Sequence, residues 1–231
     1  MTFRTREHVA MLRGFSEAAL GPPDGWTVPA GYPDGLALCV IDAIWSLGAH
    51  YDNHVVPVVE RYRDLSRAAG REPRTDTPRD LLATVQEQGG PSAFAEALAN
   101  RQRTSTHPGA PRKAEVVAKA ATMLSRLDVL TPGDLLASAT VGGAVKSEWR
   151  QLPGQRSSGV GWRYLLLLAG SQEVKADRMV CRYVSAALEV PAVGADDAEW
   201  LMTQAAADMK VELRMLDHAV WNYQRIRQRG R

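Results

Sequence analysis

The sequence is poor in cysteine. Its 231 residues include only two, Cys39 and Cys181, which stand among apolar neighbours and lack the spacing of a metal site. We predict that both are buried thiols, as fits a reducing compartment. Two cysteines also exclude an iron–sulfur cluster held by cysteine alone, which needs about four.

Long apolar runs are lacking as well. The run YLLLLAG, residues 164–170, is far shorter than the roughly 20 residues that cross a bilayer. The first residues, MTFRTREHVAML, carry charges where a secretory signal has its apolar core. We therefore expect a soluble protein of the cytoplasm with no membrane partner. The formal net charge of +2 neither requires nor excludes an anionic partner.

Strand-like alternation is almost absent, and apolar residues recur at helical spacing instead. About ten helices are expected, so the predicted fold class is all-α. The helix that starts at Leu36 is apolar on nearly every face and should therefore be central. The expected helical segments are 3–20, two helices within 36–70, 77–88, 91–100, 112–127, 131–138, 145–152, the apolar stretch up to 170, 177–188, 195–209 and 211–229.

Residues 152–182 combine a glycine-rich turn, an apolar helix and an isolated aspartate. A glycine-rich turn between two helices exposes backbone N–H groups at a helix N-terminus, where the unpaired donors and the helix dipole both favour a phosphate. Arg156 and Arg163 flank this turn and would strengthen the grip. Asp177 follows the apolar helix in a short loop.

In this order, these residues resemble the helix-hairpin-helix base-excision DNA glycosylases of the endonuclease III-like superfamily. The signature of that family is LPGxGxxTA, a helix that ends at a glycine, and then VDTHVxRV. Residues 152–154 are similar to the start of the hairpin, Gly170 to the end of the helix, and Asp177 and Arg182 to the aspartate segment. Upstream, LALCVIDAIWS resembles the LIxxILSxQT helix of the family, and PRKAEVVAKAATML its KAxxI helix. The resemblance covers about residues 36–188.

The resemblance implies two helical subdomains with a cleft between them. Residues 36–168 would form a helical-barrel subdomain that ends in the helix-hairpin-helix motif, and residues 1–35 with 169–231 a discontinuous second one. The implied activity is monofunctional hydrolysis of the N-glycosidic bond of a flipped, damaged or modified base in double-stranded DNA. Asp177 would stabilise the positive charge on the sugar and orient the attacking water, with no cofactor and no metal.

The remaining site residues are assigned from their charge, chemical type and position in the chain. Sequence-nonspecific contacts with DNA phosphates are expected from Gly154, Arg156, Ser157, Ser158, Gly159, Gly161 and Arg163 in the hairpin, and from Arg112 and Lys113 beside the polar loop 101–111. The pocket for the flipped base is expected to include Trp45, His50, Tyr51, Trp162 and Tyr164.

The chain also departs from the family pattern. The hairpin is longer, so either Gly154 or the segment 159–161 makes the turn. No lysine occurs between Lys146 and Lys175, where bifunctional enzymes carry their nucleophile, so strand-cutting lyase activity is not expected. The glutamine that fills the gap left by a flipped base is missing, because residues 47–49 read Leu-Gly-Ala.

Structural roles compete with these functional ones. Asp177 suits a helix N-cap, Trp45 suits core packing, and Arg156 and Arg163 suit solvent-exposed positions. Two alternatives for the whole protein follow: a catalytically inactive helix-hairpin-helix module that binds DNA or a partner, and a helical ligand-binding or docking protein that binds no nucleic acid.

Overall fold

The computed structural model describes residues 3–26, 31–140, 143–155, 160–171 and 178–229. Within these ranges the regular structure is helical, and the one β-contact is an isolated antiparallel bridge between Arg103 and Arg112. The predicted all-α fold is confirmed. No helix in the described part of the chain has the length and apolar character to cross a membrane.

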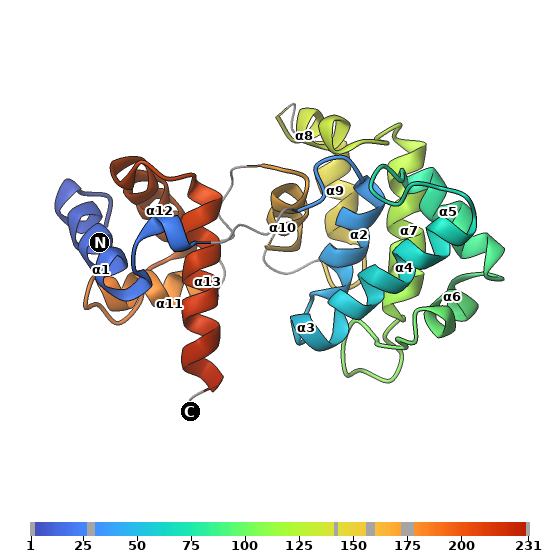
Figure 1. Cartoon of the computed structure of the whole chain (residues 1–231), viewed down its shortest axis with the longest axis horizontal. Helices are drawn as coiled ribbons and strands as arrows, with labels where there is room; N and C mark the ends of the chain where they lie inside the picture. The colour runs from blue at the N-terminus through green and yellow to red at the C-terminus, as the bar shows by residue number, and fades with distance from the viewer. Residues whose placement is uncertain (1–2, 27–30, 141–142, 156–159, 172–177, 230–231) are drawn as a thin grey trace. The chain divides into compact units, whose positions relative to one another are not determined.

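The chain divides into two compact units, residues 30–171 and residues 1–29 with 172–231. The larger unit contains the helices from α2 to α10, which are labelled in Figure 1. Their bounds are α2 Leu36–Trp45, α3 Tyr51–His54, α4 Val56–Ala68, α5 Pro78–Glu87, α6 Pro91–Ala97, α7 Lys113–Arg126, α8 Pro132–Thr140, α9 Ala144–Gln151 and α10 Val160–Leu168.

Helix α2 is the centre of the larger unit. All ten of its residues are buried, and it contacts α4, α5, α7 and α10. This agrees with its apolar sequence, because a helix without a polar face has no side to present to water. Cys39 on this helix is a buried free thiol, as predicted, whereas Cys181 in the other unit is free and half-buried.

Local signals set the ends of several helices. Thr77 caps α5 and forms a reciprocal capping box with Asp80, and Pro78 occupies the first turn, where its missing N–H has no cost. Pro57, the second residue of α4, likewise lies in the first turn of its helix. The second helix expected in 36–70 is therefore interrupted: a short α3 ends at His54, and α4 begins at Val56.

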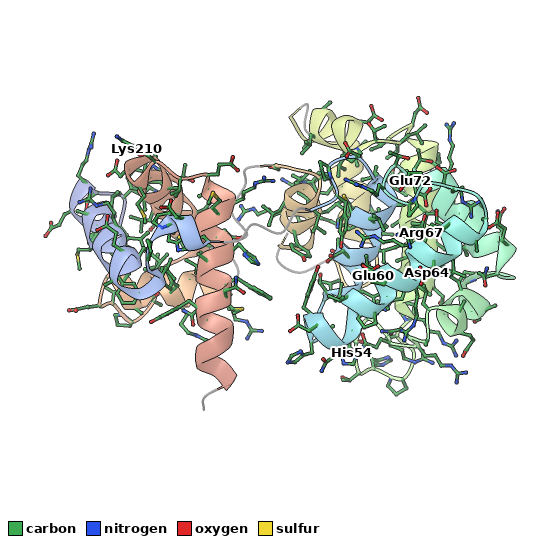
Figure 2. The ribbon with its side chains drawn as sticks, in the orientation of Figure 1. His54, Glu60, Asp64, Arg67, Glu72 and Lys210 are labelled. Atoms are coloured by element: carbon green, nitrogen blue, oxygen red, sulfur yellow. The ribbon has the colours of Figure 1, made fainter. Side chains whose placement is uncertain are left out.

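The outer face of α4 is charged. Glu60 pairs with Arg63 and Asp64 with Arg67, each three residues apart, and Figure 2 labels His54 at the end of α3 with Glu60, Asp64 and Arg67 along α4. Side chains at this spacing are neighbours on a helix surface and stabilise it only slightly. This face is therefore a solvated surface, and the buried side of α4 carries Val58, Val59, Tyr62 and Ser66.

The smaller unit has its own core, built from both ends of the chain. It comprises α1 Arg6–Leu20, the 3₁₀ turn η1 Pro23–Gly25, α11 Arg178–Ala187, α12 Ala195–Met209 and α13 Leu213–Arg229. Tyr183 lies at its centre: the ring makes edge contacts with Phe15 and Tyr223, and the hydroxyl lies 3.0 Å from Ser16 Oγ. Helix α1 thus packs against helices that lie more than 150 residues later in the sequence.

Candidate functional site

The described part of the predicted hairpin, residues 152–155, follows α9 as a tight turn. The N–H of Gln155 donates to the carbonyl of Leu152 at 3.0 Å, and Gly154 adopts a φ of 85°. A Cβ at position 154 would lie 3.4 Å from Thr104 Cβ and 3.5 Å from Leu47 Cδ1. Glycine is favoured here by the left-handed backbone and by the close packing of the turn against the polar loop and the residues after α2.

Gln155 links this turn to the start of α10. Its side chain is buried, and Oε1 accepts a hydrogen bond from Trp149 Nε1 at 3.1 Å. Nε2 of Gln155 is buried and has no hydrogen-bond partner among the residues that the structure describes. A Cβ at Gly161, in the first turn of α10, would lie only 1.8 Å from Gln155 Oε1. The absence of a side chain at Gly161 therefore lets the amide of Gln155 lie against the N-terminal turn of α10.

Several predicted residues lie outside the described part of the chain. These are the expected catalytic Asp177 and the expected phosphate ligands Arg156, Ser157, Ser158 and Gly159. Their roles stay predictions. Arg163, on α10, is half-buried.

Lys113 lies in the interior, and its expected contact with a DNA phosphate stays a prediction. Its side chain is buried, and Nζ donates to the carbonyls of Trp45 at 2.7 Å and Leu47 at 2.8 Å and to Gln102 Oε1 at 3.2 Å. The ammonium thus caps carbonyls at the C-terminus of α2. Burial lowers the pKa of Lys113 to about 8, and the three acceptors help to keep the amine protonated at neutral pH.

The arginines around the polar loop are also engaged within the chain. Arg101 and Arg112 both pair with Glu96, Arg112 at 3.7 Å, and a guanidinium nitrogen of Arg103 donates to the carbonyl of Ala110. Glu96, which lies on α6, was not among the predicted residues of the site. The expected phosphate contact of Arg112 therefore competes with an acid already in place.

The residues expected to form the base pocket separate into two groups. Trp45 and Trp162 are core residues, and the ring of Trp162 packs 6.5 Å from that of Trp149. Their burial favours core packing, and their predicted contact with a flipped base stays a prediction. His50 is exposed at the α2–α3 junction, whereas Tyr51 and Tyr164 are half-buried.

Tyr51 and Tyr164 meet at a residue that the sequence analysis did not single out, Asp42. This carboxylate is fully buried in α2 and accepts hydrogen bonds from Tyr51 Oη at 2.6 Å and Tyr32 Oη at 2.9 Å on Oδ2, and from Tyr164 Oη at 3.0 Å on Oδ1. We call these four residues the Asp42 cluster. Burial and the negative charge of Asp42 raise the pKa of each tyrosine above its ordinary value. One signal was available in the sequence: Asp42 is the one charged residue in the otherwise apolar segment 36–45.

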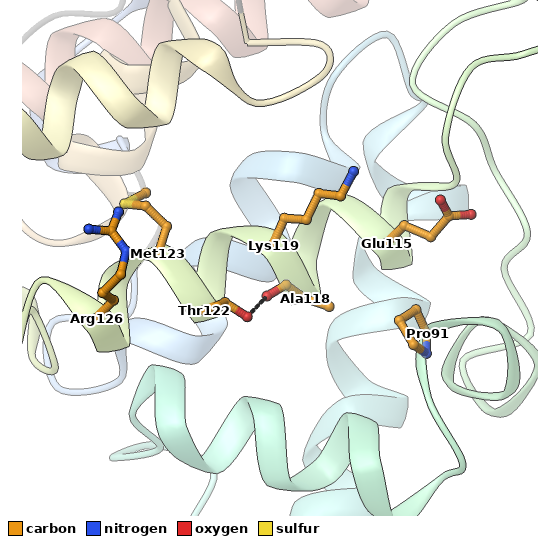
Figure 3. Close-up of a pocket in the computed structure, with 7 residues that line it drawn as sticks. All are labelled: Pro91, Glu115, Ala118, Lys119, Thr122, Met123 and Arg126. Carbon is orange, nitrogen blue, oxygen red and sulfur yellow. Dashed lines mark hydrogen bonds between the residues drawn. The ribbon is translucent and has the colours of Figure 1, made fainter.

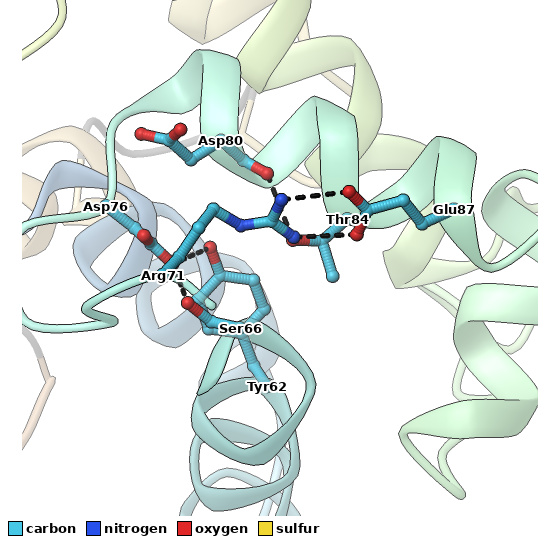
Figure 4. Close-up of polar contacts among 7 residues, drawn as sticks. All are labelled: Tyr62, Ser66, Arg71, Asp76, Asp80, Thr84 and Glu87. Atoms are coloured by element: carbon cyan, nitrogen blue, oxygen red, sulfur yellow. Dashed lines mark hydrogen bonds and ion pairs between the residues drawn. The ribbon is translucent and has the colours of Figure 1, made fainter. Parts of the chain in front are cut away.

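A second buried carboxylate in the same unit serves as a comparison. Asp76 Oδ2 accepts hydrogen bonds from Tyr62 Oη at 2.7 Å and Ser66 Oγ at 2.6 Å (Figure 4). Nearby, Arg71 donates to Thr84 Oγ1 and forms a two-pronged ion pair with Glu87. These contacts fix the connection between α4 and α5, and none of the predicted site residues takes part.

A shallow groove runs along the outer side of α7, with a volume of about 420 Å³. It is lined by Pro91, Glu115, Ala118, Lys119, Thr122, Met123 and Arg126 (Figure 3). Arg126 also pairs with Glu148. The groove contains none of the predicted site residues. Among the described residues, no group of three or more histidine, cysteine, aspartate or glutamate side chains is placed to hold a metal ion.

Comparison with known proteins places the chain in a family. The model of a domain of unknown function (DUF8548) matches residues 10–225, so the chain belongs to that family. No curated protein and no solved structure is detectably similar to it.

Proposed function

We propose that this member of the DUF8548 family is a monofunctional DNA glycosylase-like protein of the cytoplasm. It would hydrolyse the N-glycosidic bond of a flipped, damaged or modified base in double-stranded DNA. The observation that carries the proposal is the order of a glycine-rich turn, an apolar helix and an aspartate over residues 152–182, with two further family-like helices upstream. The hairpin lacks a lysine, so no strand cleavage is proposed.

The geometry around α10 supports the phosphate-binding part of the proposal. The first backbone N–H groups of a helix have no partner within the helix and favour an anion. Gln155 Nε2, a buried donor with no partner in the described part of the chain, belongs to a side chain that lies against the first turn of α10 at Gly161. A phosphate at this helix end would give unpaired donors an acceptor.

The proposed reaction needs one carboxylate. As the bond between the base and the anomeric carbon breaks, its electron pair leaves with the base and positive charge develops on the sugar. Asp177 would stabilise that charge and accept a proton from water, whose oxygen bonds to the anomeric carbon. The departing base takes up a proton from solvent, and an abasic site remains.

The test is a glycosylase assay on duplexes that carry uracil, alkylated purines or oxidised bases, with alkali to cleave abasic sites. Wild type should yield a product on at least one substrate. Asp177→Asn should abolish it and change duplex affinity by less than about twofold, because the carboxylate acts mainly on the transition state. Asp64→Asn is the matched control, since Asp64 is an exposed aspartate on α4, and it should cleave like wild type. Equal cleavage by Asp177→Asn and wild type would refute the catalytic role.

A second candidate keeps the DNA contact without the reaction. It is favoured by the longer hairpin and by the Leu-Gly-Ala segment at 47–49, where the family has its gap-filling glutamine. This candidate predicts duplex binding that weakens steeply with salt and yields no abasic product on any substrate. Absence of binding even at low salt would refute both candidates and favour a helical protein that binds no nucleic acid.

A further inference from the structure

The Asp42 cluster joins three segments that are distant in the sequence. Tyr32 precedes α2, Tyr51 is the first residue of α3, and Tyr164 lies on α10, which follows the predicted hairpin. Each donates its hydroxyl to the same carboxylate. One buried group therefore connects the α2–α3 junction, residues 46–54, with the helix whose N-terminus is proposed to bind phosphate.

Other contacts fix the same segments from the side. The N–H of Tyr32 donates to the carbonyl of Leu168 at 2.8 Å. Gly31 has a φ of 53°, and a Cβ there would lie 2.6 Å from the same carbonyl, so only glycine permits this approach. Lys113 holds the carbonyls of Trp45 and Leu47 where the chain leaves α2. The junction is thus held at its beginning by Lys113 and, through Tyr51, by Asp42.

A buried carboxylate holds helices together only at the expense of a large desolvation penalty. Removing a carboxylate from water is strongly unfavourable, and hydrogen bonds offset this penalty only when their geometry is good. Apolar residues of similar volume often stabilise a core equally well or better. What a buried carboxylate with three hydroxyl donors adds is direction, because each tyrosine must point at one of two oxygens.

We propose that Asp42 is a positioning residue that makes the α2–α3 junction and α10 move as one body. The junction carries His50 and Tyr51, and α10 carries Gly161 and Arg163, so the coupling would keep the base-facing and phosphate-facing sides of the proposed site in register. The coupling is inferred from the contacts of the Asp42 cluster. The identity of the ligand, duplex DNA, rests on the proposed function.

The first test needs no DNA. Tyr164→Phe and Tyr51→Phe each remove one hydroxyl and keep the ring, and Tyr62→Phe is the matched control, because it removes the same kind of bond to the buried Asp76. We expect Tyr164→Phe to raise amide hydrogen exchange about tenfold in residues 46–54 as well as in α10, and Tyr51→Phe to do the same in α10. Tyr62→Phe should raise exchange around 62–77 and leave both segments unchanged. Effects confined to the helix that carries each substitution would overturn the coupling.

The second test measures affinity for a duplex that carries an abasic-site analogue. Tyr164→Phe and Tyr51→Phe should weaken binding about tenfold, while Tyr62→Phe, at comparable loss of stability, should stay within about twofold of wild type. If wild type binds and all three variants bind alike, the positioning role is refuted and the proposed function stands. If wild type does not bind, the proposed function fails, and the exchange experiment still decides whether Asp42 couples the two segments.

Discussion

Asp42 and Lys113 are two buried charged residues of the larger unit, and each connects several segments through its hydrogen bonds. Lys113 was expected at the surface because Arg112 and a polar loop precede it in the sequence. The helical phase of α7 instead puts it on the same face as Val116, Val117 and Ala120, which are buried. Its ammonium then reaches the open carbonyls at the end of α2. Lys113 therefore stabilises the interior, although it follows a basic loop. Its helical spacing from the buried apolar residues of α7 predicts this burial better than its charged neighbours do.

Lys113→Met should lower the free energy of unfolding by about 2–3 kcal/mol at pH 7, because two helix-end carbonyls and Gln102 lose a charged donor. The loss should grow by about 1–2 kcal/mol at pH 9.5. The pKa of Lys113 is about 8 in the folded protein and about 10.4 in an unfolded chain, so between these values the unfolded state binds more protons and wild type gains stability as pH rises. Urea unfolding at the two pH values measures both effects. A constant difference between variant and wild type would contradict the lowered pKa.

At the level of elements, the packing between α9 and α10 requires a glycine at position 161. The backbone of Gly161 is helical, so the requirement does not come from its conformation, although the sequence suggests a hairpin glycine. In the structure its missing Cβ makes room for the buried amide of Gln155, which also holds Trp149. Helix existence and type could be read from periodicity, as for α2 and α7. The contact between Gly161 and the side chain of Gln155 could not be predicted, because local spacing does not show that Gln155 points into the core.

Gly161→Ala should therefore destabilise the protein by about 1–3 kcal/mol, since Gln155 must leave its position and the Trp149 bond is lost. Gly133→Ala in α8 is the control: its nearest neighbour is 3.6 Å away, and higher helix propensity should make it neutral or stabilising by up to about 1 kcal/mol. Adding Gln155→Ala to Gly161→Ala should cost less than the sum of the single changes, measured as a double-mutant cycle in urea. Additive losses would mean that the two residues do not compete for space.

At the level of the whole chain, the all-α fold was predictable because strand-like alternation is nearly absent. The candidate site was predictable only in part. Tyr51 and Tyr164 were predicted to contact a flipped base, and the structure brings them together around Asp42, which no sequence motif indicated. Their meeting depends on which helix faces pack against one another, and the sequence pattern does not show this. Trp45 and Trp162 were expected to line the same pocket and lie in the core, because aromatic character alone does not distinguish these two environments.

The two units have separate cores, which predicts separate responses to truncation. Deleting residues 1–20 removes α1 and exposes the apolar faces of α11, α12 and α13 that it covers. Amide hydrogen exchange should then become fast throughout 178–229, while residues 36–126 keep their protection. Equal loss of protection in both units would show that the larger unit needs the smaller one to fold.

The order of the segments also affects how the chain is made. Helix α1 is synthesised before residues 178–229, which form the helices that cover Val9 and Leu12. The larger unit forms its core within residues 30–171, so it can fold while residues 172–231 are still being synthesised. Until residues 178–229 have been synthesised, the apolar face of α1 stays exposed to water, where a chaperone can bind it or aggregation can begin.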